Sequence, residues 1–588
     1  MSCSLVVYVN NDDALLIWSV EAIVAQWQGF AVQRKHKHGT GWTEAIWLEN
    51  WTTAGPQAHQ SGTHQSSRQW PFRCLTWTDH SVSQGDCVSY RVIPILSDGS
   101  IDESNASQWS GEQTLGAPST TPYSAYFNRG FVISQFISRY LDQRFPGMSR
   151  SDALAAFKSG LSDSSEEAIR HFLGGLIRPT MLELLASAKA DGGHIYAALF
   201  ELADPELQAG LTALGPRAHL VLANGSSEKR KSETTADARK RDENRTARAA
   251  LAASHCDVEA LNRFVAPQPL AHNKFMVVTD AQQTPMLVWT GSTNWTPTGL
   301  CTQLNNGLLC QDPDVAKAYL TQWRALRAAA SGHPDSLTSD NSKPASFVSA
   351  SGVRTTVQFT RANKRVDLAA LGDVVAAAKL GVLFLMFMPG AAGALADVRA
   401  AAKRPELLVR GVVSTLPNGP ADEHTGNTTT LTTTLLGGPP SLPKTQTVDV
   451  VQPQGMEHVA AGWAIETTRQ QFLSRIGYAI IHSKVLVVDP FSDDPVVVTG
   501  SHNFSISASE DNDENYIIIR GDHKLAEAYA VNIESAWRHY AARMGNPHTS
   551  LRRSAYLEAL LEDQQREKCF WGVSPPSNDL GTSNEMRR

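Results

Sequence analysis

The chain has 588 residues, enough for two to four domains of about 150 residues each and for a sizeable buried core. Its 42% hydrophobic and 19% charged residues are typical of a globular protein and exclude a disordered or fibrous one. The 52 basic residues against 58 acidic ones give a net charge of −6, which argues against a protein that coats nucleic acid by bulk charge.

The seven cysteines are sparse and odd in number, so the sequence predicts no disulfide framework and favours a reducing compartment. Residues 1–20 lack a basic start and are interrupted by the polar run 10–13, which is not typical of a signal peptide. The most apolar window, Leu380 to Met388, is too short to span a bilayer and predicts a buried strand. We therefore expect a cytoplasmic protein, with signal-free export as the alternative.

The first part of the chain predicts an all-β domain. Short apolar runs alternate with turn residues at Ala14–Trp18, Phe30–Arg34, Ala45–Leu48 and Val88–Leu96. The runs at 16–18, 29–34 and 90–92 resemble those of a fibronectin type III-like sandwich. We expect a small sandwich over residues 1–112, used for docking or spacing.

From residue 118 the pattern becomes helical and then alternates between strands and helices. Helical periodicity covers Phe131–Tyr140, Ser151–Ser159 and Glu166–Ala190. A strand–helix–strand order then occurs twice, at His194–Leu202, Pro205–Leu214 and Ala218–Leu222, and at Val382–Met388, Ala392–Ala402 and Leu407–Val413. Such units predict a parallel or mixed sheet between helix layers, and their recurrence indicates an internal duplication. We expect a first half over 118–340, a second over 341–545 and a helical or disordered tail over 546–588.

Three further segments are polar or irregular. Ser226–Arg248 is rich in both basic and acidic residues, and we leave open whether it is a solvated helix or loop or a flap that faces phosphate. Asn418–Thr447 is rich in Thr, Pro and Gly and predicts a long loop, while Leu551–Glu567 is amphipathic.

Two short motifs occur twice each and in the same order. Only two histidines are followed two residues later by lysine, in His272-Asn273-Lys274 and His482-Ser483-Lys484. Each pair precedes a Gly-Ser-x-Asn tetrapeptide, which begins at Gly291, 19 positions after the first histidine, and at Gly500, 18 positions after the second. The pairing of two rare patterns at nearly one spacing predicts two equivalent half-sites.

The predicted strands explain the spacing. His and Lys are two residues apart at the start of a strand, so both side chains point to one face. Another strand leads to the Gly-Ser-x-Asn turn, where we expect Ser292, Asn294, Ser501 and Asn503 to bind phosphate by donating hydrogen bonds to its oxygens. Two imidazoles and two ammonium groups around one pocket favour phosphate chemistry, in which one histidine attacks phosphorus and the other protonates the leaving oxygen. Paired lysines argue against a metal ion, and we expect no cofactor.

The motifs resemble the paired HKD signatures of the phospholipase D superfamily over roughly residues 120–545. The resemblance implies a two-lobed α/β fold of two pseudo-twofold-related halves, here preceded by the small sandwich. It also implies metal-independent cleavage or transfer of a phosphodiester through a phosphohistidine intermediate. The catalytic residues it implies are His272, Lys274, His482, Lys484 and Glu514. With both motifs in one chain, the site is expected to be complete without a second subunit.

The two motifs are not identical. Asp489 stands at the expected aspartate position of the second, whereas the first has Thr279 there, and we expect Asp280 or a shifted strand end to compensate. Family members often carry a glutamate that hydrogen-bonds the motif histidine. Glu514 fits this role after the second motif, and the equivalent residue after the first is Asn305. We expected the carboxylate to lie beside His482, making it the general acid, and the amide to lie beside His272, making it the nucleophile.

Three functions follow as alternatives. A phospholipid headgroup bond is the preferred substrate. The phrases at 291–296 and 500–505 also resemble those of nucleases and cardiolipin hydrolases, so a DNA or RNA phosphodiester is the second candidate. The third is a non-enzymatic member that acts as a binding module, which the presence of all eight core residues of the two motifs disfavours. A further alternative is an effector whose N-terminal sandwich recruits a protein partner or a target surface.

Overall fold

The computed structural model describes residues 3–22, 24–50, 64–130, 140–141, 143–162, 167–225, 240–258, 269–390, 392–414, 448–451, 481–541 and 567–572, and the single residues 234, 237, 263, 561 and 564. Two compact units contain them. The N-terminal unit holds the described residues up to 118 and from 561 onward, and the two-sheet unit holds those from 119 to 541. None of the described helices is long and apolar enough to cross a membrane.

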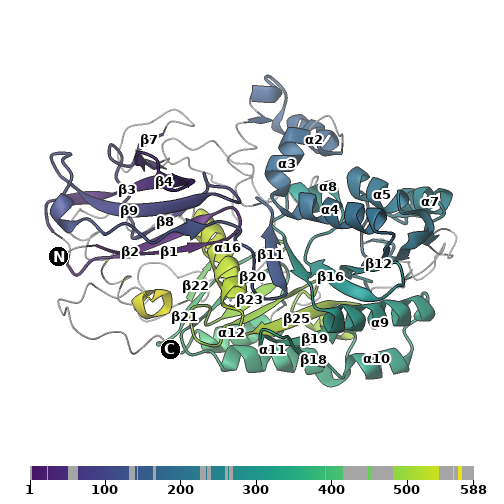
Figure 1. Cartoon of the computed structure of the whole chain (residues 1–588). Helices are drawn as coiled ribbons and strands as arrows, with labels where there is room; N and C mark the ends of the chain where they lie inside the picture. The colour runs from purple at the N-terminus through teal and green to yellow at the C-terminus, as the bar shows by residue number, and fades with distance from the viewer. Residues whose placement is uncertain are drawn as a thin grey trace. The chain divides into compact units, whose positions relative to one another are not determined.

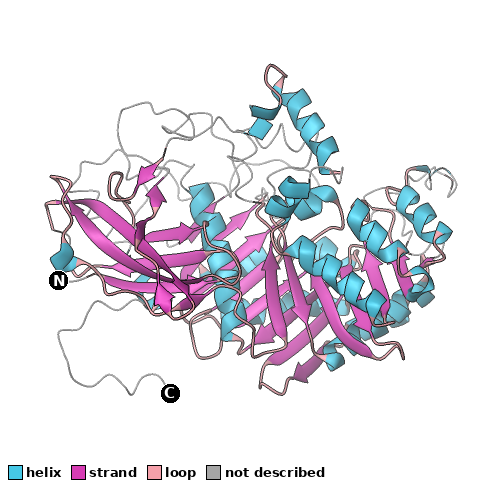
Figure 2. Cartoon of the chain, turned by 45° about the horizontal axis from the view of Figure 1, so that its top comes forward, coloured by secondary structure: helices cyan, strands magenta, loops and turns pink. Residues whose placement is uncertain are grey.

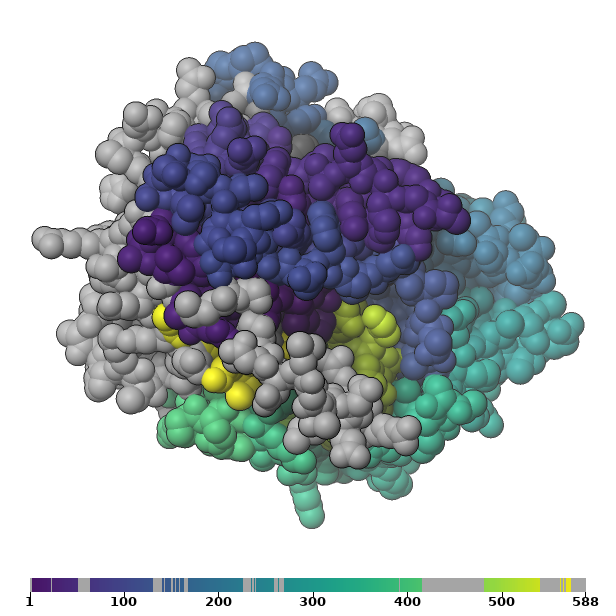
Figure 3. All heavy atoms as spheres, turned by 60° about the vertical axis from the view of Figure 1, so that its left-hand side comes forward, coloured from purple at the N-terminus to yellow at the C-terminus, as the bar shows by residue number. Residues whose placement is uncertain are grey.

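The N-terminal unit is built from antiparallel strands (Figure 2), and its surface is the purple and dark-blue area of Figure 3. One sheet has the order β1-β2-β8 and the other β10-β9-β3-β4, with β5 also paired to β3. The strands are β1 (Ser4–Val9), β2 (Ala14–Ser19), β3 (Trp27–His38), β4 (Gly41–Trp42), β5 (Ile46–Trp47), β8 (Thr76–Asp79), β9 (Cys87–Leu96) and β10 (Gln113–Thr114). The short pair β6 (Glu49–Asn50) and β7 (Gln65–Ser66) lies outside these sheets.

Both sheets of the N-terminal unit share one hydrophobic core, as expected of a sandwich. Trp18 from β2, Phe30 from β3 and Val92 from β9 lie in the same buried cluster. The described part of the C-terminal tail packs on this unit, because Tyr8 donates its hydroxyl to the carbonyl of Trp571 at 2.7 Å. The all-β prediction is confirmed, while the closer resemblance to fibronectin type III stays a prediction.

The two-sheet unit contains two mixed sheets with the same strand order (Figure 1). The first runs β11-β17-β16-β15-β12-β13-β14 and the second β19-β25-β24-β23-β20-β21-β22, with β18 added at one edge. The first comprises β11 (Tyr123–Phe127), β12 (His194–Leu199), β13 (Ala218–Leu222), β14 (Asp257–Val258), β15 (Lys274–Thr279), β16 (Pro285–Gly291) and β17 (Asn306–Cys310). The second comprises β18 (Ala345–Val348), β19 (Arg354–Phe359), β20 (Gly381–Met386), β21 (Leu408–Val413), β22 (Val448–Val451), β23 (Val485–Val488), β24 (Val496–Gly500) and β25 (Asn515–Arg520). Seven strands in one order, twice, confirm the two-lobed α/β fold.

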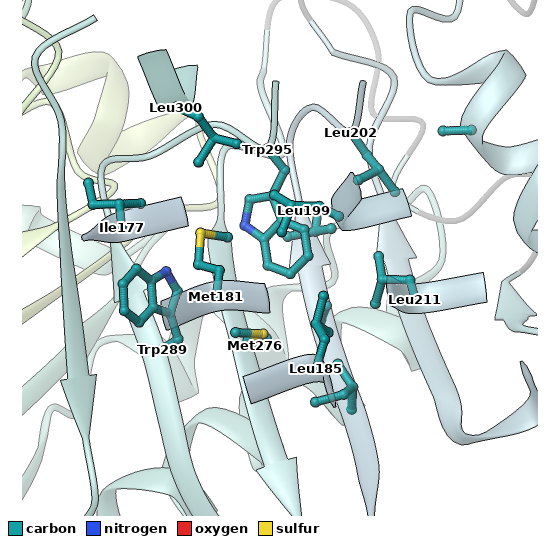
Figure 4. Close-up of a cluster of buried hydrophobic side chains, with 14 of the residues drawn as sticks. Ile177, Met181, Leu185, Leu199, Leu202, Leu211, Met276, Trp289, Trp295 and Leu300 are labelled. Carbon is teal, nitrogen blue, oxygen red and sulfur yellow. The ribbon is translucent and has the colours of Figure 1, made fainter. Parts of the chain in front are cut away.

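Helices cover both faces of the first sheet. α4 (Ile177–Ala190), α5 (Pro205–Thr212) and α8 (Pro297–Cys301) pack on one face, where Met181 and Leu185 meet Met276 and Trp289 (Figure 4). α9 (Pro313–Ala329) covers the other face and also contacts β18 and β19 of the second sheet. Correspondingly, α16 (His523–Ala541) packs on the second sheet and contacts β11 of the first. The two halves therefore share one interface, lined by α9 and α16.

The remaining helices are α2 (Arg150–Leu161), α3 (Glu167–Gly174), α7 (Arg245–Ala253), α10 (Asp335–Asn341), α11 (Val366–Ala376), α12 (Ala394–Ala401) and α15 (Ile506–Glu510). The helix expected over Glu166–Ala190 is wrong as one element, because it breaks between α3 and α4 at Gly175. Gly175 has φ of +50°, and a Cβ there would lie 2.4 Å from the carbonyl oxygen of Phe127. The break thus lets the chain pass closely over β11.

Several expectations lie wholly or largely outside the described residues. These are the helix at 131–140, the loop at 418–447, the amphipathic stretch at 551–567 with the rest of the tail, and much of the basic segment at 226–248. The domain boundaries expected from the sequence also stay predictions.

Candidate active site

Each HxK segment leads into a strand of its own sheet and is anchored by the other half. The backbone N–H of His272 donates to the carbonyl of Asp513 at 2.9 Å, and that of His482 donates to the carbonyl of Leu304, also at 2.9 Å. Parallel β-bridges between Ala271 and Asp513 and between Leu304 and Ile481 join the two halves at the same positions. Both histidines are 4% exposed, so they lie in the interior where the halves meet.

The imidazole rings are oriented through their Nδ1 atoms. His272 Nδ1 lies 2.8 Å from Glu514 Oε2. His482 Nδ1 lies 2.9 Å from Asn305 Oδ1 and 3.1 Å from the carbonyl oxygen of Ser292. Since these partners are acceptors, each ring holds its proton on Nδ1 and has its Nε2 lone pair available. The structure records no hydrogen bond to either Nε2 atom from a described residue.

The expected pairing of histidines and orienting residues is therefore wrong. We predicted Glu514 beside His482 and Asn305 beside His272, but each orienting side chain crosses to the other half. The reason is that β17 and β25 begin at the interface between the halves. Asn515, next to Glu514, accepts from Thr290 of the first half at 2.8 Å, and Asn306, next to Asn305, donates to Thr499 of the second at 2.7 Å. Sequence spacing alone carries no information on this exchange.

The motif lysines are arranged alike in the two halves. Lys274 Nζ donates to the carbonyl of His272 at 2.8 Å, and Lys484 Nζ donates to that of His482 at 2.5 Å. Each ammonium group also lies over a phenylalanine ring, 4.9 Å from the centroid of Phe200 and 4.8 Å from that of Phe387 respectively. The same two rings pack against the motif histidines, with centroids 4.7 Å and 4.8 Å from the imidazoles. Each phenylalanine ring therefore contacts both the histidine and the lysine of one motif.

Burial and mutual repulsion shift the ionisation of this cluster. Burial lowers the pKa of His272 to about 4, although Glu514 opposes the shift. Burial together with Lys484 and Lys274 holds the pKa of His482 well below its usual value. The pKa of Lys484 is also lowered well below its ordinary value, by burial and then by Lys274. Two buried lysines that repel each other suit an anion bound between them.

In both Gly-Ser-x-Asn turns the serine hydroxyl is hydrogen-bonded, whereas the side-chain oxygen of the asparagine is not, within the described part of the chain. Ser292 donates to Asn305 at 2.7 Å, and Ser501 accepts from the backbone and side-chain amide groups of Asn515. These hydroxyls therefore hold the turns next to the histidines' partners. The side-chain oxygens of Asn294 and Asn503 are buried and have no hydrogen-bond partner among the described residues.

The two aspartates that follow the motifs differ in what they hold. Asp489 accepts from the backbone N–H groups of Lys379, Leu380 and Gly381 at 2.7 to 2.8 Å and so fixes the start of β20. Among the described residues, the carboxylate of Asp280 accepts only from the backbone N–H groups of residues 282 and 284 of its own turn. Asp280 itself therefore does not compensate for Thr279, and compensation by a shifted strand end stays a prediction. One residue of displacement at the strand end directs its carboxylate into the turn.

Sequence reasoning missed several neighbours of the histidines. Phe200 and Phe387 follow β12 and β20, and their recurrence at equivalent positions was a usable signal. Glu201 accepts from Asn294 Nδ2 at 2.8 Å, and burial raises its pKa. Thr360 accepts the backbone N–H of Glu514 at 3.0 Å, and it is distant in sequence from either motif.

The described end of the basic segment is structural. Arg248 donates to Asp242 at 3.1 Å and to the carbonyls of Leu222 and Ala223, which fixes α7 beside β13. Within the residues that the structure describes, no group of three or more His, Cys, Asp or Glu side chains is placed to hold a metal ion.

Parts of the chain are similar in sequence to known proteins. A family model described as "Cardiolipin synthase, PLD-like domain" matches residues 181–327 and 442–537. "Phospholipase D" of Rickettsia prowazekii (strain Madrid E) is 47% identical over 53 residues, which make up 9% of this chain and 23% of that relative.

Two solved structures are similar at low identity. Polyphosphate kinase of Porphyromonas gingivalis is 12% identical with a TM-score of 0.40, over 66% of this chain and 51% of the other. Phosphatidylserine synthase of Haemophilus influenzae Rd KW20 is 12% identical with a TM-score of 0.38, over 67% and 92%. Similarity at this level carries no conclusion about substrate.

Proposed function

Because the chain belongs to the phospholipase D superfamily, we propose that it is a metal-independent phosphodiesterase that works through a covalent phosphohistidine. The observation that carries the proposal is the pair of buried histidines, each held through Nδ1 by a partner from the other half. Lys274 and Lys484 supply the positive charge for the phosphate. One chain provides both half-sites.

We assign the attack on phosphorus to His272. Bond formation from Nε2 leaves a positive charge on the ring, and Glu514 is the carboxylate in hydrogen-bond contact with a motif histidine. A carboxylate at Nδ1 stabilises that charge and fixes the reactive tautomer. The sequence favoured the same nucleophile, but on a pairing that the geometry reverses.

We assign the general acid role to His482, whose Nδ1 partners are neutral. The protonated ring is therefore a stronger acid than it would be beside a carboxylate, and a bound phosphate anion favours its protonation. As the bond from His272 Nε2 to phosphorus forms, the bond to the leaving oxygen breaks and that oxygen takes the proton of His482.

The second step regenerates the protein. Neutral His482 accepts a proton from water, the water oxygen bonds to phosphorus, and the phosphorus–nitrogen bond breaks. An alcohol in place of water gives transfer instead of hydrolysis. No further reactant is required.

The charges around the site favour a phospholipid or other isolated phosphodiester over nucleic acid. Glu201 lies close enough to Lys274 to raise the pKa of that lysine. Glu243 in turn lies close enough to Glu201 to raise the pKa of Glu201. A nucleic acid carries further phosphates on either side of the scissile one, whereas an isolated phosphodiester brings no second phosphate next to these acidic side chains. The N-terminal unit would then serve to recruit a partner or a target surface.

Wild type and Lys484→Ala are compared in EDTA, on mixed-headgroup vesicles and on single- and double-stranded DNA and RNA. We expect headgroup release that requires Lys484. Nucleic-acid cleavage that requires Lys484 would show the nuclease alternative to be right. Activity that EDTA abolishes would contradict the metal-independent mechanism.

A further inference from the structure

The ends of β12 and β20 occupy equivalent places but differ by one residue. Phe200 and Phe387 make matching contacts to the motif histidines and lysines. The next residue is Glu201 in the first half and Met388 in the second. The pseudo-symmetry therefore places a carboxylate on the His272 side and a thioether, 48% exposed, on the His482 side.

Glu201 has a buried neighbour with unmet hydrogen-bonding capacity. Asn294 is only 5% exposed, and its amide donates to Glu201 Oε2 at 2.8 Å. Its side-chain oxygen has no partner among the described residues. The adjacent backbone explains this proximity, because the N–H groups of Ala203 and Asp204 donate to the carbonyl of Trp295.

The Glu201 side is therefore rich in acceptors. The carboxyl group and the amide oxygen of Asn294 both accept, and Glu243 adds negative potential that raises the pKa of Glu201 beyond the effect of burial. Lys274 opposes this shift, but its ammonium group is held by the His272 carbonyl and lies over the Phe200 ring.

The ligand group that fits these acceptors has several N–H donors and a positive charge. A primary ammonium meets both needs, since it donates up to three hydrogen bonds. A hydroxyl brings one donor and no charge, and a quaternary ammonium brings charge without a donor. Recognition of a quaternary ammonium uses aromatic faces, and Lys274 already lies over that of Phe200.

We propose that Glu201 and Asn294 bind a primary ammonium group of the substrate beside its phosphate, so that the site prefers aminoalkyl phosphodiesters. The proposal rests on the phosphodiesterase function proposed above. Such an ammonium occurs both in lipid headgroups and in free glycerophosphodiesters.

The test compares kcat/KM for diesters of three headgroup alcohols, each presented as a soluble ester and as a lipid in vesicles. Glycerophosphoethanolamine, glycerophosphocholine and glycerophosphoglycerol are the soluble substrates, and the corresponding phosphatidyl lipids are presented in vesicles. For wild type we expect about a tenfold preference for the ethanolamine esters, the size of one charge-assisted hydrogen bond. Preference in both settings indicates a general aminoalkyl site, and preference in vesicles alone assigns it to a lipid headgroup.

Glu201→Gln preserves the shape and an acceptor for Asn294, and we expect it to reduce the preference to about twofold or less. Met388→Gln is the matched control at the equivalent position and keeps the preference. Each ratio is measured within one preparation, so partial misfolding cancels. Equal rates on all three alcohols in wild type, or a preference retained by Glu201→Gln, would overturn the ammonium site while leaving the phosphodiesterase intact. Failure to cleave any of the six would instead contradict the proposed function, and the ammonium site with it.

Discussion

The two halves of the two-sheet unit agree in strand order and in the arrangement of their motif residues, and they differ in where they place carboxylates. Strand order, the His–Lys pairs and the phenylalanines beside them are the same. The differences are Glu514 against Asn305, Glu201 against Met388, and Asp489 against Asp280. In the proposed function, the shared features bind the phosphate and the unshared ones give each half a separate task. Four predictions test this comparison, from the largest effect to the smallest.

The motif histidines should be equally essential for alkyl esters but not for esters with a good leaving group. His272→Ala removes the nucleophile and should lower kcat by about 10⁴-fold or more on every diester. His482→Ala should do the same for alkyl esters but retain more activity on bis(p-nitrophenyl) phosphate, whose leaving group needs no proton. Trapped phosphoprotein, located by mass spectrometry, should carry phosphate on His272. Phosphate on His482 would reverse the assignment.

Exchanging the orienting residues should separate their roles. Glu514→Gln keeps the shape but loses the charge that stabilises His272 during attack, so kcat should fall about 100-fold or more. The pKa of His272, about 4 in the wild type, should fall further because Glu514 raises it. Asn305→Asp should raise the pKa of His482 for the same reason. Titration of labelled histidine side chains by NMR measures both pKa shifts. An unchanged pKa of His272 in Glu514→Gln would contradict the pairing of these two residues.

The aspartates should differ in their contribution to stability. Asp489→Ala leaves three backbone N–H groups without their acceptor, and we expect it to lower the free energy of unfolding by about 2–3 kcal/mol. Asp280→Ala affects only its own turn and should cost about 1 kcal/mol or less. Urea unfolding of both variants gives the comparison, and equal costs would mean that Asp280 has a role beyond its turn.

The phenylalanines should be the place where the halves behave alike. Phe200→Leu and Phe387→Leu each remove a ring beneath an ammonium group while keeping most of the apolar volume. A cation–π contact of about 0.5–1 kcal/mol predicts a loss in kcat/KM of about two- to fivefold for each. Steady-state kinetics on one soluble diester measures both, and a large loss in only one variant would show that the matching contacts have different functions.

Sequence alone gave the elements closely, because their signals are local. The strand predicted over Ala218–Leu222 coincides with β13, and the one predicted over Leu407–Val413 begins one residue before β21, since buried apolar runs bounded by turn residues specify them. The motif residues were also found, because their spacing repeats. Helix continuity through Gly175 was misjudged, since the break depends on the close approach of Phe127.

The partners of the histidines were beyond sequence reasoning for a different reason. Glu514 lies 11 residues after Asn503, and that short distance suggested His482 as its partner. The actual partner, His272, is 242 residues away. Only the meeting of the two sheets makes that contact, and no spacing or periodicity encodes it. Glu201 was not predicted as a site residue, because a single acidic residue after a strand has no distinguishing pattern.

The crossed pairing has a consequence for the growing polypeptide. His272 emerges from the ribosome long before residue 514, and until then it lacks both the carboxylate at Nδ1 and the Asp513 carbonyl that fixes its backbone. The His272 imidazole is thus aligned only after the second sheet has been translated and has folded against the first. A nascent chain released early would carry one complete motif without the contacts that orient its histidine.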